Sequence, residues 1–420
     1  MMRLRFNNEA NGKLILIGVT IGIWLLIIIL FKTYGYEQTW QLWRVPTEMP
    51  PFVDFRLIPG SAESFLKGYE PTVKNPYDPR ERIFNYPVFW RIFFYSGVTQ
   101  ADTIWISTLM IVFFFIAVFI FPEKLTVSNA IWMLIVVFSP ASMLLYERGN
   151  VDLIVFVLCV LIVLAENYSS LLAAGLLMFG IVVKVYPFFG ISVLLKETRA
   201  RFLLLSAVCL AMLVSYAYVS NKSMNASWNT TVRGTEMSYG TNVFFQRYEE
   251  QMLRYVNPAL LKFGPIVLGV ILILIVALAG MHDRQSPQAT SERNLAAFRI
   301  GASIYVGTFL LGNNWDYRLA FLILVIPQLL QWTTSPNKRC RIVALIGMFT
   351  LLASCWHFVA WNSPFLAFHL DFKEYVFVFD ELMNWILLMS LSCLLFASAP
   401  EWVKDLLGNP FAKKAMSTPT

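Results

Sequence analysis

Charged residues are scarce in this chain. Only 14% of the 420 residues are Asp, Glu, Lys or Arg, whereas 57% are hydrophobic and 15% are aromatic. A soluble domain is typically about 25% charged and about 45–50% apolar. Apolar runs of about 17–25 residues, long enough to cross a bilayer as helices, recur along the whole sequence. The composition therefore excludes an ordinary soluble domain and predicts an all-α polytopic membrane protein, organised as one domain over residues 1–420.

The sequence also lacks the patterns of several common sites. Its three histidines are far apart and do not have zinc-site spacing, so we expect no metal site. It contains no G-x-x-x-x-G-K-[ST] phosphate loop, so ATP-driven transport by this chain has no support. Four of the five cysteines lie in apolar runs and Cys340 lies in a basic loop, which indicates packing and not a disulfide framework. We expect no cofactor and no nucleic-acid partner.

The first apolar run, at residues 14–31, follows Lys13 and has no small-residue cleavage site behind it. We therefore interpret it as a transmembrane helix and not as a cleavable signal peptide. With the later apolar runs it gives about twelve predicted spans, at residues 14–31, 101–121, 127–145, 151–165, 170–184, 186–196, 201–219, 264–281, 295–312, 319–333, 341–357 and 376–397.

Lysines and arginines in the short loops predict the orientation of these spans. They cluster in alternate loops, and the positive-inside rule then places those loops and both termini on the cytoplasmic side. The fifth and sixth spans are short and are interrupted by Lys184, Tyr186 and Pro187. One long helix in their place would move every later basic cluster to the outside. We therefore expect a short hairpin that reaches the outer face near Lys184.

Two segments outside the membrane, residues 32–100 and 220–263, are too long to be simple connections. Loops longer than about 12–15 residues are usually functional or disordered. The first segment is rich in aromatic residues and prolines, unlike a disordered tail. We expect it to form an ordered layer of short interfacial helices, and we expect both segments to lie on the external side.

Four polar elements fall on this external face in the predicted topology. Asp54 follows two prolines in the first long segment and is a candidate base, although a solvated loop acid or a helix N-cap is the simpler alternative. Lys184 lies in an apolar run, where a lysine either faces a cavity, a partner or a substrate, or extends its side chain to the interface. In YERGNVD (residues 146–152), Arg148 and Asp152 either contact a ligand or pair with each other.

The fourth element, LGNNWDYRLAF (residues 311–321), lies at the outer end of the ninth predicted span. It is either part of a site or an aromatic belt with an ion pair. Together the four elements supply several cations and carboxylates at one membrane boundary. Cations there suit an anionic headgroup such as a lipid phosphate. A carboxylate beside them suits proton abstraction from a hydroxyl.

The order of these motifs resembles glycosyltransferase family 87, whose members have the GT-C fold, use polyprenyl-phosphate sugars and include bacterial mannosyltransferases. The resemblance covers roughly residues 14–330, and the family often has YPP where Val88 replaces the second proline here. It rests on VDF (53–55), GYEP and NPYDP (68–71 and 75–79), FNYPVFW (84–90), ERGNVDLIVF (147–156) and AAGLLMFGIVVKVYP (173–187).

This resemblance implies that a single sugar, mannose or another hexose, is transferred from a polyprenyl-phosphate donor to a hydroxyl of a glycolipid or glycan acceptor, with inversion. It implies that Asp54 is the catalytic base, and that Lys184, Arg148 and Arg318 bind the donor phosphate. No metal is required by this scheme. The residues expected to contact the substrates are Asn85, Tyr86, Asn150, Asp152, Tyr186, Asp316 and Tyr317.

The location implied by the resemblance is a bacterial inner membrane, with membrane lipid around the helices and the active site on the periplasmic side. A transporter or flippase for lipid-linked sugars is the main alternative, since it would also explain many spans and charged residues near the membrane. The lack of an evident inverted repeat counts against it. A polymerase or ligase of surface glycans is a third possibility, because it shares the substrates and the external loops.

Overall fold

The structure is a computed structural model that describes residues 8–221, 234–281, 291–361 and 370–407, together with Asn225 and Thr230. Its described part is mostly helical, which confirms the predicted all-α membrane architecture at that level. Six described helices are long and apolar enough to cross a bilayer: α1 (Asn8–Tyr34), α4 (Thr103–Ile120), α9 (Arg199–Val219), α13 (Pro258–Met281), α16 (Lys338–Trp361) and α17 (Leu370–Ala397).

The predicted span at residues 127–145 is broken into α5 (Val127–Val137) and α6 (Pro140–Arg148), which are bent by 56° relative to each other. Pro140 lies in the first turn of α6, where its missing N–H costs no helical hydrogen bond. Ser139 caps this helix, because its hydroxyl accepts a hydrogen bond from the Ser142 N–H at 3.3 Å. The pair counts as a seventh span only if the two pieces are taken as one.

The remaining predicted spans correspond to shorter or more polar helices. α7 (Asp152–Glu166), α8 (Ser170–Val183) and η3 (Tyr186–Lys196) have 15, 14 and 11 residues, fewer than the about 17–25 that cross a bilayer. α8 and η3 pack against each other, so residues 170–196 are not one straight helix. The twelve-span topology itself stays a prediction. The other helices in this group are α14 (Glu292–Leu310), η4 (Asp316–Val325) and α15 (Ile326–Thr333).

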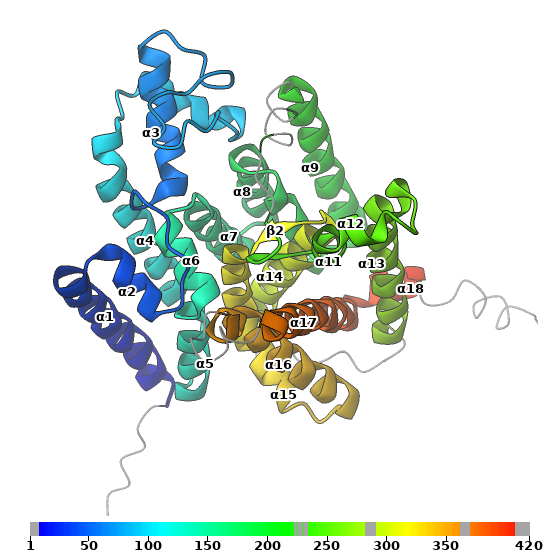
Figure 1. Cartoon of the computed structure of the whole chain (residues 1–420). Helices are drawn as coiled ribbons and strands as arrows, with labels where there is room; N and C mark the ends of the chain where they lie inside the picture. The colour runs from blue at the N-terminus through cyan, green and yellow to red at the C-terminus, as the bar shows by residue number, and fades with distance from the viewer. Residues whose placement is uncertain are drawn as a thin grey trace, which may run out of the picture.

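Two mostly buried helices, α7 and α14, lie in the middle of the molecule (Figure 1). α7 packs against α4, α8 and α14, and α14 packs against η3, η4 and α17. Gly307 allows η3 to approach α14 closely, because a Cβ there would lie 2.1 Å from Cγ of Phe189. By contrast, only Leu205 and Cys209 of α9 are buried, as expected for a helix that faces lipid.

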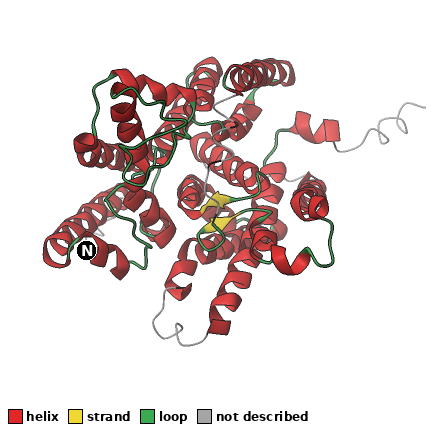
Figure 2. Ribbon diagram, turned by 45° about the horizontal axis from the view of Figure 1, so that its top comes forward, coloured by secondary structure: helices red, strands yellow, loops and turns green. Residues whose placement is uncertain are grey.

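The first predicted external segment contains α2 (Tyr36–Leu42), α3 (Val53–Leu66), η1 (Val88–Tyr95) and η2 (Gln100–Asp102). The described part of the second contains α11 (Val243–Arg247), α12 (Glu249–Met252) and a two-residue strand, β1 (Ser238–Tyr239). β1 pairs antiparallel with β2 (Asn314–Trp315), a feature that the all-α prediction does not include; these strands are the yellow pair in Figure 2. The last described helix is α18 (Glu401–Leu407).

The five cysteines are free. Cys340 was expected in a basic loop, and this placement is wrong, because the residue is buried in the first turn of α16. The basic residues on either side of it are polar enough to look like a loop in the sequence, but they form the exposed start of a long helix.

Candidate functional site

Asp54 lies in the first turn of α3, and its side chain is 22% exposed. Phe52 takes a left-handed conformation at the N-cap position, with φ of 60°. The side chain of Arg56 stabilises this turn by donating from Nε to the Pro51 carbonyl at 2.8 Å. The N-cap alternative for Asp54 is therefore wrong. A carboxylate in the first turn of a helix is still stabilised by the helix dipole.

The YERGNVD turn brings an amide to this carboxylate. Gly149 ends α6 with φ of +56°, and a Cβ at this position would lie 2.9 Å from Cβ of Phe52, so the turn needs a glycine. The next residue, Asn150, donates from Nδ2 to Oδ2 of Asp54 at 2.7 Å. The same Nδ2 donates to the hydroxyl of Tyr317 at 3.1 Å. One amide therefore connects helix α3 to the start of η4.

Two cations lie on the other side of the same amide. Lys184 donates to Oδ1 of Asn150 at 3.2 Å and forms an ion pair with Asp152, whose side chain is fully buried. Arg318 contacts the other Asp152 oxygen, with 3.2 Å between Nε and Oδ2. Asp152 pairs with both cations, and Asp54 supplies the second carboxylate that balances their charge. We call this group the site cluster; its members are Asp54, Asn150, Asp152, Lys184, Tyr317 and Arg318.

The backbone around Lys184 explains why its side chain does not extend to solvent. α8 ends at Val183, and Lys184 is in an extended conformation with φ of −162°. The indole N–H of Trp90 in η1 donates to the Val183 carbonyl at 2.9 Å and so fixes the end of α8. The Lys184 side chain is 13% exposed, which contradicts the alternative of a lysine that simply reaches out to the interface.

Two tyrosines form aromatic walls beside the cations. Nζ of Lys184 lies 5.9 Å from the ring centre of Tyr86 and 5.7 Å from that of Tyr186. The guanidinium of Arg318 lies 5.2 Å from the Tyr186 ring, within the about 6 Å range of cation–π contacts. Burial, and then the charge of Asp54, raise the pKa of Tyr86 well above its usual value. Its hydroxyl therefore stays protonated and can donate to the backbone carbonyl of Asp54, 3.5 Å away.

Arg82 is a neighbour of the catalytic candidate that the sequence reasoning missed. Its Nη2 donates to the Val53 carbonyl at 2.6 Å and to Oδ1 of Asp78 at 2.8 Å, while its Nη1 lies 3.7 Å from Oδ1 of Asp54. Burial opposes the charge of Arg82, but the hydrogen bonds and the charge of Asp78 raise its pKa above the usual value. The available signal was an aspartate and an arginine close together in the proline-rich NPYDPRER segment.

Arg148 has a different environment from the other two predicted phosphate ligands. Its guanidinium lies 2.8 Å from a carboxylate oxygen of Glu147 and 3.0 Å from one of Glu48, and its side chain is 6% exposed. The alternative that Arg148 pairs with Asp152 is wrong, because Asp152 pairs with Lys184 and Arg318. Arg148 joins the end of α6 to the first predicted external segment, and a contact with the donor phosphate stays a prediction.

Two predicted substrate contacts belong neither to the site cluster nor to its aromatic walls. Asp316 is fully buried and faces His357 of α16, with 3.5 Å between Oδ2 and Nε2. Asn85 is half-buried next to Tyr86, and no hydrogen bond described for this part of the chain joins it to the cluster. Within the described residues, no group of three or more His, Cys, Asp or Glu side chains has an arrangement that could hold a metal ion.

The model of glycosyltransferase family 87 matches residues 84–311, which is more than half of the chain. The chain belongs to this family. It is therefore a membrane glycosyltransferase, as the resemblance implied. No curated protein and no solved structure matches the chain. The part of this family 87 glycosyltransferase that matches begins after Asp54 and ends before η4. It contains Asn85, Tyr86, Arg148, Asn150, Asp152, Lys184 and Tyr186.

Proposed function

We propose that this glycosyltransferase moves a single hexose from a polyprenyl-phosphate donor to a hydroxyl of a glycolipid or glycan acceptor. Mannose is the first candidate for this hexose. The observation that carries the proposal is the site cluster. In it a partly exposed carboxylate, Asp54, shares the amide of Asn150 with Lys184. Lys184 and Arg318 in turn contact a single carboxylate, Asp152. A base next to an anion-binding group is what transfer from a phosphate donor requires.

In this proposal Lys184 and Arg318 bind the donor phosphate, with Arg148 as a further ligand if Glu48 moves away. The side chains of Lys184 and Arg318 are 13% and 16% exposed, so part of each cation is open to a phosphate. Charge-assisted hydrogen bonds from such cations are about twice as strong as neutral ones. They stabilise the charge that develops on the departing phosphate.

The chemical step follows from these positions. The Asp54 carboxylate accepts the proton of the acceptor hydroxyl, and the hydroxyl oxygen attacks the anomeric carbon on the face opposite the phosphate. The bond from the anomeric carbon to the phosphate oxygen breaks, and its electron pair leaves with the polyprenyl phosphate. The sugar configuration is inverted, and Asp54 later releases the proton to water. The scheme consumes no metal or cofactor.

The other predicted contacts take supporting roles. Asn150 and Tyr317 orient Asp54, and Asp152 orients the two cations, while Tyr86 and Tyr186 border the sugar. Asn85 lies next to Tyr86 and contacts the acceptor in this proposal. Asp316, the first residue of η4, acts through the two residues that follow it. The external placement of the site, and a bacterial inner membrane as its location, rest on the basic loops and on the family.

The test is turnover of a radiolabelled polyprenyl-phosphate mannose by the purified protein in detergent, with an alkyl mannoside as the acceptor. We expect labelled disaccharide and free polyprenyl phosphate to appear together. A polyprenyl-phosphate glucose in a parallel assay distinguishes the hexose. A transporter or flippase would leave the donor intact, because detergent removes the two compartments, and an intact donor with both sugars would contradict the proposal. A polymerase would instead add many sugars to one acceptor.

A further inference from the structure

Outside the site cluster, three buried titratable side chains from three helices meet. His357 of α16 lies between Asp316, the first residue of η4, and Asp380 of α17. Nε2 of His357 is 3.5 Å from Oδ2 of Asp316, and its Nδ1 is 3.5 Å from Oδ1 of Asp380. The three side chains are 4%, 0% and 6% exposed. We call them the buried triad.

The hydrogen-bond partners of the histidine fix where its protons lie. Nδ1 is 2.8 Å from the Ser354 carbonyl, which can only accept, so Nδ1 carries a hydrogen. Nε2 faces the Asp316 carboxylate, and a hydrogen on Nε2 would make this contact attractive. Neither Asp316 oxygen has a hydrogen-bond partner among the described residues, so the 3.5 Å contact with the histidine is its main compensation. Asp380 is also held by Asn384, whose Nδ2 donates to its Oδ1 at 3.1 Å.

The triad is joined to the site cluster by the first turn of η4. The backbone N–H of Asp316 donates to the Met237 carbonyl at 3.0 Å, next to the β1–β2 pair. The side chain of Asp316 then faces α16, while those of the next two residues face the site. Tyr317 contacts Asn150, and Arg318 contacts Asp152. A shift of this turn would therefore move two contacts of the site cluster together.

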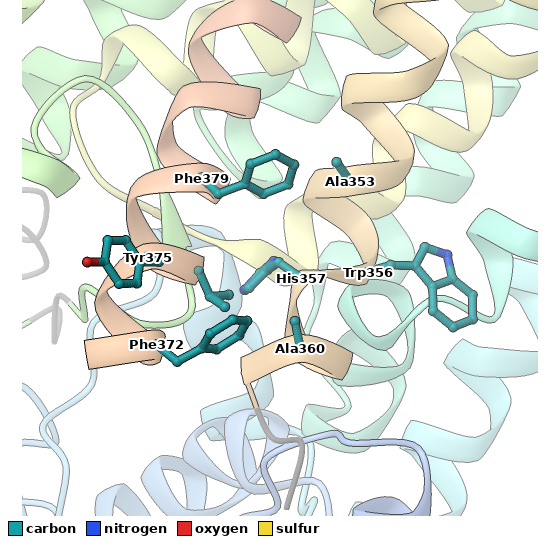
Figure 3. Close-up of a pocket in the computed structure, with 8 residues that line it drawn as sticks. Ala353, Trp356, His357, Ala360, Phe372, Tyr375 and Phe379 are labelled. Carbon is teal, nitrogen blue, oxygen red and sulfur yellow. The ribbon is translucent and has the colours of Figure 1, made fainter. Parts of the chain in front are cut away.

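The histidine also borders a pocket. Its ring lines a cavity of about 420 Å³ between α16 and α17 (Figure 3). The other walls are apolar side chains, with Phe372, Tyr375 and Phe379 on α17 and Trp356 on α16. The ring has free volume on one side and carboxylates on its two nitrogens. Its polar contacts therefore act together with packing against Phe358, whose ring centre lies 4.1 Å away.

We propose that the buried triad is a positioning device for sugar transfer, in which His357 holds the first turn of η4 so that Tyr317 and Arg318 keep their contacts with Asn150 and Asp152. The expected effect of the triad on the kinetics of sugar transfer rests on the proposed function. Its expected effect on the position of η4 does not. His357 touches neither substrate nor Asp54 and is a positioning residue. Glu381 of α17 is buried nearby without a hydrogen-bond partner among the described residues, so charge changes in this region act on it too.

The experiment compares three variants with the wild-type chain in detergent. His357→Leu removes both donors, whereas His357→Gln keeps an N–H that can reach Asp316. The matched control is Trp356→Phe, which alters the same helix and the same cavity and removes a hydrogen bond to Ile135 in α5, not to η4. Hydrogen–deuterium exchange is measured in peptides that cover residues 314–319, and kcat and donor KM are measured per folded protein.

We expect His357→Leu to raise exchange in residues 314–319, to lower kcat and to raise the donor KM. The combined loss in kcat/KM should be on the order of ten- to a hundredfold, as for a small displacement of reacting groups. His357→Gln and Trp356→Phe should stay near wild type. A merely structural role would lower the yield of folded protein and leave its exchange in η4, its kcat and its KM unchanged, which would overturn the proposal.

A double variant separates two consequences of losing His357: the loss of positioning of η4 and the burial of an unpaired carboxylate. His357→Leu with Asp316→Asn removes the charge that His357→Leu leaves unpaired, so thermal stability should recover while kcat/KM stays low. Recovery of kcat/KM together with stability would overturn the proposal. If the wild-type protein transfers no sugar, the proposed function fails on its own. The exchange data then decide the positioning of η4, and unchanged exchange in His357→Leu would overturn it.

Discussion

At the scale of single residues, charge alone does not separate a structural from a functional side chain in this protein. Lys184 and Arg148 look alike in the sequence, since each is a cation beside an apolar run. In the structure Arg148 lies between two carboxylates, whereas Lys184 and Arg318 share one, Asp152. Lys184 and Arg318, which share one carboxylate, are therefore the stronger candidates to bind phosphate.

Arg82 offers a test of how Asp54 is held. Arg82→Ala removes the hydrogen bond to the Val53 carbonyl and the positive charge 3.7 Å from Asp54. Hydrogen bonds to charged groups contribute about 1.5–3 kcal/mol, so we expect the transfer rate to fall on the order of ten- to a hundredfold. The measurement is kcat per folded protein.

Arg80→Ala is the matched control for Arg82. Arg80 lies two residues away and pairs with Glu48, and its side chain is 44% exposed. Exposed ion pairs contribute about 0–1 kcal/mol, so its loss should change little. Equal losses in the two variants would show that Arg82 has no special role at Asp54.

At the scale of elements, the turn between α6 and α7 determines whether Asn150 can reach Asp54. Gly149 has a left-handed backbone, and an alanine in that conformation costs about 1–2 kcal/mol. The new Cβ would also lie 2.9 Å from Cβ of Phe52, which adds packing strain. We expect a lower melting temperature and a lower transfer rate. Gly175→Ala is the control, because nothing lies within 4 Å of its added Cβ in α8. A Gly149→Ala protein as stable and active as wild type would contradict this account of the turn.

The elements also show what the sequence could predict. Long apolar runs predict α1, α4, α9, α13, α16 and α17, because helix length and composition are local properties. The break at Pro140 has a local signal in Ser139-Pro140, but the apolar run around it hides the signal. The β1–β2 pair and the contact of Asp316 with His357 join residues far apart in the chain, and neither leaves a local pattern. The site cluster was predictable as a set of residues, but its hydrogen bonds were not.

At the scale of the whole molecule, the account needs the site cluster and the external segments on one side of the membrane. Single cysteines in a cysteine-free background test this with an impermeant thiol reagent in intact cells. We expect labelling at the exposed positions Lys74 and Glu250, and none at the exposed position Thr334 between α15 and α16. Labelling of Thr334 in intact cells would contradict the predicted topology. Permeabilised cells, in which all three sites should react, are the control.

Asp54→Asn tests the central claim most directly. The change keeps the size of the side chain and an oxygen for the Asn150 amide, but it removes the proton acceptor. Loss of a general base typically lowers the rate by about 10²–10⁴. The measurement is sugar transfer from polyprenyl-phosphate mannose by folded protein, with donor affinity and melting temperature measured in parallel. The account predicts that transfer collapses while donor binding and stability remain near wild type. Transfer at a near wild-type rate would show that Asp54 is not the base.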